Sequence, residues 1–84
     1  MRSIHFNVKP EVTHAAQEAL LHGMNALPGI HRVASLNAQA KDATIRRMCF
    51  AEVKEDADIH ALLKRIQSMS EVESADMPAQ RGLA

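Results

Sequence analysis

Five histidines and one cysteine are the side chains of this 84-residue sequence best suited to metal binding or covalent chemistry. The histidines are His5, His14, His22, His31 and His60. No two are four residues apart, the spacing that presents two ligands on one helix face, and neither HExxH nor CxxC occurs. His14 and His22 could share a helix face, but two turns would separate them, too far to chelate one ion. We therefore expect scattered surface histidines and no metal site.

Cys49 is the single cysteine, so no intrachain disulfide can form. A catalytic cysteine needs a base and a cleft beside it. A cysteine between Met48 and Phe50 is more typical of a small buried hydrophobic residue. The chain has no GxSxG motif, and its three glycines form no phosphate-binding loop. The sequence therefore favours a non-enzymatic protein without a cofactor.

The overall composition narrows the classes of partner. Ten basic and ten acidic residues cancel, whereas a nucleic-acid-binding protein usually has a basic surface. Tryptophan and tyrosine are absent and phenylalanine occurs twice, so aromatic platforms for stacking bases are scarce. No apolar run approaches the length of a membrane span, and no signal peptide is evident. We expect a cytoplasmic protein that binds neither nucleic acid nor membranes.

The first half of the chain predicts a strand, a helix and a second strand. Apolar residues alternate over residues 4–8, which is typical of a strand with one buried face. Thr13 can cap the helix that follows, where Ala16, Leu20, Met24 and Leu27 form an apolar stripe. Pro28-Gly29 ends this helix, and residues 30–38 are predicted to be the second strand, with Val33 pointing inward.

The second half repeats the order strand, helix, strand. Residues 44–53 are predicted to be a strand, and residues 55–58 supply helix N-cap candidates. A second apolar stripe predicts a helix and consists of Ile59, Leu62, Leu63, Ile66 and Met69. Residues 72–77 are predicted to be the last strand. The order β-α-β-β-α-β predicts an α+β, ferredoxin-like fold with a four-stranded antiparallel sheet and both helices on one face. Residues 1–77 would form this single domain, and residues 78–84 an extended tail.

The third predicted strand raises the question of which sheet face is buried. Cys49, Ala51 and Val53 share one face, and Met48 and Phe50 share the other. If Val53 lies on the core side, Met48 and Phe50 lie on the open side and suggest a contact surface. A bulge or the reverse parity would instead bury Phe50 in the core.

One stretch resembles the heavy-metal-associated domain. The segment LPGI at residues 27–30 and the spacing of Val8 are similar to the entry of that family. The resemblance places the family's two metal cysteines at Thr13 and Ala16, and neither residue can bind a soft metal ion. It therefore implies the family's fold and not its copper or zinc function.

A longer stretch, FAEVKEDADIHALLKRIQSMSEVESADMPAQRGLA at residues 50–84, is similar to the second half of another family, the propeptides and standalone inhibitors of subtilisin-like serine proteases. The shared pattern is a strand, an acidic turn, an amphipathic helix, a short break, and then Val-x-x-Ala before an acidic residue. Val72, Ala75 and Asp76 fill these last positions. Pro78 departs from the pattern, because the family often has a second acidic residue there.

This resemblance implies how the chain would act. The open sheet face would pack on two surface helices of a protease, and Asp76 would cap one of them. The tail would lie in the substrate cleft like a product, with Ala84 in the first specificity pocket, although Ala84 is small for that pocket. The implied partner-binding residues are Met48, Phe50, Asp76, Pro78, Ala79, Gln80, Arg81, Gly82, Leu83 and Ala84.

Two other functions remain open. The open sheet face could join two copies of the chain through Met48 and Phe50. Alternatively, the chain could bind a small ligand, or a metal ion through its histidines, as a ferredoxin-like domain without the CxxC ligands.

Overall fold

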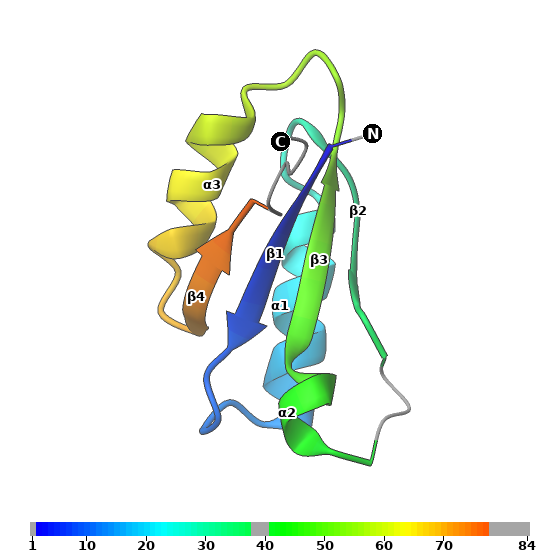
Figure 1. Cartoon of the computed structure of the whole chain (residues 1–84), viewed down its shortest axis with the longest axis vertical. Coiled ribbons are helices and arrows are strands. Elements are labelled where there is room, and N and C mark those ends of the chain that lie inside the picture. The colour runs from blue at the N-terminus through cyan, green and yellow to red at the C-terminus, as the bar shows by residue number, and fades with distance from the viewer. Residues whose placement is uncertain (1, 38–40, 78–84) are drawn as a thin grey trace, which may run out of the picture.

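The computed structural model describes residues 2–37 and 41–77, which form four strands and three helices (Figure 1). In chain order these are β1 (Arg2–Val8), α1 (His14–Asn25), β2 (Ile30–Ser35), α2 (Ala43–Arg46), β3 (Met48–Val53), α3 (Ile59–Gln67) and β4 (Val72–Asp76). The strands form one sheet in the order β2-β3-β1-β4, and every neighbouring pair is antiparallel. The predicted α+β fold with a four-stranded antiparallel sheet is confirmed.

The two central strands supply the inner face of the sheet. Ile4, Phe6 and Val8 of β1 are at most 2% exposed, as their alternation predicted. In β3 the buried residues are Cys49 and every second residue after it, Ala51 and Val53. Figure 1 shows α1 behind β1 and β3, where these side chains meet the buried residues of the helices.

Each edge strand contains an irregularity in its pairing that changes which of its residues face the core. The β2–β3 register shifts between Ile30 and Arg32, so Ile30 and Val33 are both buried although they are three residues apart. The β1–β4 register shifts beside Asn7, and Val72 and Ala75 of β4 are likewise both buried. Such bulges turn a strand to keep apolar side chains on the core side.

The predicted helix caps are present. Thr13 Oγ1 accepts a hydrogen bond from the backbone N–H of Ala16 at 3.1 Å, and α1 begins at His14. Among residues 55–58, which were the predicted candidates, Asp58 is the N-cap of α3. Its side chain accepts hydrogen bonds from the N–H groups of His60 and Ala61. Each cap satisfies backbone donors that a helix start leaves without a partner inside the helix.

The buried stripe of α1 differs from the predicted one. Ala16 is exposed, and Gln17 is buried beside it, with Met24 two turns further on. Leu20 and Leu27 are half-buried against the core. The prediction was wrong at Ala16 because the helix turns its Gln17 side toward β3, where a polar contact described below holds it.

The predicted stripe of α3 is confirmed. Ile59, Leu62 and Ile66 are buried in the same core cluster as the central strands, and Leu63 and Met69 pack half-buried at its margin. Both α1 and α3 therefore bury their apolar sides against the inner face of the sheet. Within the described residues no helix is long and apolar enough to cross a membrane.

A short helix that the sequence did not predict, α2, replaces the start of the predicted third strand. Residues 43–46 form α2, and β3 begins only at Met48. Asp42 causes the turn, because its Oδ1 accepts from the N–H of Thr44 at 2.8 Å and its carbonyl accepts from Arg46 N at 3.1 Å. The second strand also ends at Ser35, earlier than predicted.

Candidate functional site

The outer face of the sheet, opposite α1 and α3, is here called the open face. Its residues follow from the strand register, which sets Ala34, Phe50, His5 and Asp76 side by side across the four strands. A second row joins Met48, Asn7 and Ser74, where Asn7 Nδ2 donates to Ser74 Oγ at 3.1 Å. A polar row of Ser3, Glu52 and Arg32 lies on the other side of Phe50.

Apolar side chains gather on the β2–β3 half of the open face. Phe50 is half-buried and Met48 is 38% exposed. Leu36 continues the pairing beyond β2, because its backbone N–H donates to the Met48 carbonyl at 2.8 Å, and it is 46% exposed. The alternative that placed Phe50 in the core is wrong, since the neighbouring Cys49 and Ala51 are the buried residues.

A charged pair borders this apolar patch. The Arg32 guanidinium carbon lies 5.1 Å from the centroid of the Phe50 ring, within the range of a cation–π contact. Arg32 Nε also lies 3.5 Å from Glu52 Oε1. Arg32 therefore lies over the ring, while Met48 and Leu36 remain exposed to solvent or to a partner.

Asp76 is the last residue of β4 and is exposed. Within residues 2–37 and 41–77 its carboxylate makes no hydrogen bond or ion pair, although the register sets it opposite His5. None of the described residues therefore occupies its oxygens, which can accept from donors on a partner. Met77 follows and is 36% exposed. The predicted tail residues, 78–84, lie outside the described residues.

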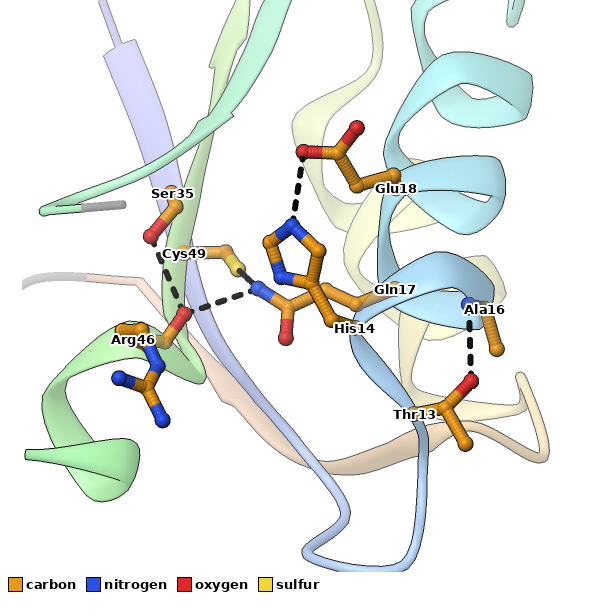
Figure 2. Close-up of polar contacts among 8 residues, drawn as sticks. All are labelled: Thr13, His14, Ala16, Gln17, Glu18, Ser35, Arg46 and Cys49. Carbon is orange, nitrogen blue, oxygen red and sulfur yellow. Dashed lines mark hydrogen bonds and ion pairs between the residues drawn. The ribbon is translucent and has the colours of Figure 1, made fainter. Parts of the chain in front are cut away.

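A polar cluster on the helix side of the sheet contains Cys49 (Figure 2). Gln17 Nε2 donates to the Arg46 carbonyl at 2.8 Å and to Cys49 Sγ at 3.6 Å, and Ser35 Oγ donates to the same carbonyl at 3.1 Å. These contacts tie α1, β2 and β3 to α2. Sequence reasoning missed Gln17, because a glutamine beside an alanine gives no periodic signal of burial.

Burial controls the chemistry of Cys49. The side chain is 1% exposed, and this burial raises the pKa of the Cys49 thiol to about 11, with the Gln17 hydrogen bond opposing the shift. Its polar neighbours are the Gln17 amide and, at 3.5 Å, the Arg47 carbonyl, neither of which is a base. The thiol is therefore protonated near pH 7, and its position is that of the small buried residue predicted from the sequence.

The five histidines are exposed and distributed over the surface. His14 Nε2 lies 3.4 Å from Glu18 Oε2, one turn further along α1. Across the part of the chain that the structure describes, no three histidine, cysteine, aspartate or glutamate side chains are grouped so that they could hold a metal ion.

Comparisons of the chain with protein-family models, with curated proteins and with solved structures found no match. The candidate site consequently rests on its own geometry: an exposed apolar patch on the open face, and at the end of β4 a carboxylate that no described residue pairs.

Proposed function

We propose that this chain is a non-enzymatic protein-binding module that inhibits a subtilisin-like serine protease or assists its folding. The observation that supports it best is the open face, where Met48, Phe50 and Leu36 form an apolar patch that none of the described helices covers. Contiguous exposed apolar side chains on a small domain mark interaction surfaces. Burial of this patch against a partner supplies a driving force that none of the polar rows can supply.

We also infer that the fold is the ferredoxin-like arrangement of the propeptide family. The strand order β2-β3-β1-β4 supports this inference. β1 and β2 enclose β3, and β3 and β4 enclose β1, so each strand–helix–strand unit spans an intervening strand, as in a split βαβ pair. The short α2 lies between the two units and alters neither of them.

In this proposal the Asp76 carboxylate caps a helix of the protease. The first turn of a helix carries backbone N–H groups without partners inside the helix, and it is the positive end of the helix dipole. A carboxylate exposed at the end of an edge strand can accept from such groups on another protein. In this proposal residues 78–84 continue from Asp76 into the protease cleft and add to it as a strand through backbone hydrogen bonds.

Inhibition assays test the proposal. The full chain and a version without residues 81–84 are compared as inhibitors of a purified subtilisin-type protease, with a peptide substrate. We expect inhibition by the full chain and its loss on truncation, because the removed residues would occupy the cleft. An inactive full chain, or inhibition that survives truncation, contradicts the proposed mode of binding.

A matched pair of aspartate variants tests whether Asp76 caps a helix of the protease. Asp76→Asn removes the charge at the end of β4, and Asp56→Asn removes one from the exposed loop before α3. Loss of a charge at a helix start weakens an interaction by roughly 0.3–2 kcal/mol. We expect the inhibition constant to rise by about 2- to 30-fold for Asp76→Asn and to stay unchanged for Asp56→Asn. Equal effects of the two variants would refute the role of Asp76.

The same patch supports a second candidate, a homodimer joined through the open faces. Phe50 and Met48 of one copy would then be covered by those of another, and no protease would be required. Light scattering separates the two functions: a stable dimer that Phe50→Asp converts to a monomer favours this candidate. A monomer at all concentrations excludes it, provided that circular dichroism shows both proteins folded.

A further inference from the structure

A pocket lies at the β2 edge of the molecule, on its helix side. Its volume is about 360 Å³, and its walls come from α1, from β2 and from α2. The polar lining includes His14, Gln17, His22 and Arg46. A smaller hollow of about 130 Å³ shares three of these residues and adds Arg47. Neither hollow is lined by the apolar residues of the open-face patch.

Gln17 is a buried polar side chain whose Oε1 makes no hydrogen bond with a described residue. It is 7% exposed, and its Nε2 is committed to the Arg46 carbonyl and Cys49 Sγ. The Arg46 carbonyl can only accept, so the amide cannot be turned around without losing this bond. Gln17 Oε1 accepts no hydrogen bond from any described residue, and it is not sealed from solvent. In Figure 2 it points away from both partners of Nε2.

Two arginines and one glutamate are the charged residues that line the two hollows, and Arg46 Nη1 also donates to the Lys41 carbonyl at 3.2 Å. His14 and His22 line the pocket from α1, and Arg46 and Arg47 line the two hollows from the other side. Glu18 is the acidic residue of the lining, and its carboxylate lies 3.4 Å from His14. The two arginines outnumber the one carboxylate and therefore favour a negatively charged group, and Gln17 Oε1 can accept a hydrogen bond from it.

We propose that this pocket binds a small hydroxylated anion. The anionic group, a carboxylate or a phosphate ester, is held by the arginine and histidine side chains, since guanidinium groups match both kinds of oxyanion. A hydroxyl of the same molecule donates to Gln17 Oε1. This site goes beyond the proposed protease binding and does not depend on it.

Pairs of small molecules test whether binding requires both an anionic group and a hydroxyl. Binding is followed by nuclear magnetic resonance of the ¹⁵N-labelled full chain. Glycerol 3-phosphate is compared with propyl phosphate, and glycerate with propionate, so each pair differs only in its hydroxyl groups. We expect saturable shifts of amides in α1, β2 and α2, and a roughly tenfold tighter affinity for the hydroxylated member of at least one pair. The pair that responds identifies the anionic group.

Absence of saturable shifts with all four probes overturns the proposal. Equal affinities within both pairs also overturn it, because Gln17 Oε1 would then have no part in binding. Shifts that centre on the open face would place the site elsewhere and have the same consequence.

The variants change side chains outside the hydrophobic core: His22, His60 and Arg65 are exposed, and Arg47 is half-buried. His22→Gln and Arg47→Gln alter the lining, and His60→Gln and Arg65→Gln are matched controls on α3. We expect about a tenfold loss of affinity for Arg47→Gln, a smaller loss for His22→Gln, and none for the controls. Equal losses in the controls would contradict the location. Protease inhibition should be the same for all four variants, which separates this site from the open face.

Discussion

Cys49 is the residue whose chemistry the fold changes most. Burial raises the pKa of its thiol from 9.0 to about 11, so the folded protein retains the thiol proton where the unfolded chain loses it. The associated stability is fully present below pH 9 and is lost as the pH rises to about 11. We expect the free energy of unfolding to fall over this interval, as measured by urea denaturation at a series of pH values.

Cys49→Ala is the control for this titration. All other titratable groups are the same in both proteins, so the difference between the two curves belongs to the thiol. The curves should converge as the pH rises from 9 to 11. Parallel curves would show that the Cys49 pKa is not raised by folding.

Gln17 is expected to stabilise the position of α2. Gln17→Leu removes the donor to the Arg46 carbonyl and leaves Ser35 as the remaining side-chain donor to it. Loss of such a buried bond costs about 1–3 kcal/mol of unfolding free energy. Gln67→Leu is the matched control, because Gln67 donates to the Ala75 carbonyl from an exposed position. Urea denaturation should show the larger loss for Gln17→Leu, and the reverse order would refute this role.

At the scale of the elements, the apolar side of α3 predicts different losses of stability at two positions. Ile66 is fully buried, and Leu63 is half-buried at the edge of the core. Ile66→Ala should cost about 2–5 kcal/mol of unfolding free energy, because it leaves a cavity. Leu63→Ala should cost about 1 kcal/mol, because solvent can fill the space. Equal costs, measured by thermal or urea denaturation, would mean that α3 is rotated relative to the sheet.

The elements also show what the sequence could predict. Alternation in β1 and the stripe of α3 are strong because every buried position is apolar and regularly spaced. The caps at Thr13 and Asp58 were predictable because their side chains act on the next few residues. The short α2 was not, because it depends on a turn at Asp42, whereas the β-branched Thr44 and Ile45 that follow favour a strand.

Contacts between elements were harder to predict than the elements themselves. The bulges beside Arg32 and Asn7 shift the parity of β2 and β4, and alternation alone does not locate a bulge. The side of Phe50 was undecided for a similar reason. Its strand alternates large and small residues, Cys49 and Ala51 being the small ones, so hydrophobicity alone favoured neither face.

At the scale of the whole molecule, the two sides of the sheet have different tasks. The inner face buries its residues against α1 and α3 and accounts for the core. The open face exposes Leu36 and Met48 and half-exposes Phe50, which contribute little to the stability of the isolated chain. This division supports the proposal that a partner covers the open face.

The methionines allow this central claim to be tested in one sample. Met48 and Met77 are exposed, Met48 on the open face and Met77 just after β4, while Met24 is buried and Met69 packs half-buried on the helix side. The measurement is a methyl spectrum of the chain with ¹³C-labelled methionine methyl groups, recorded as a catalytically inactive subtilisin-type protease is added. The account predicts that the Met48 and Met77 signals shift while those of Met24 and Met69 stay in place. Unchanged signals throughout, or shifts confined to Met69, would contradict it.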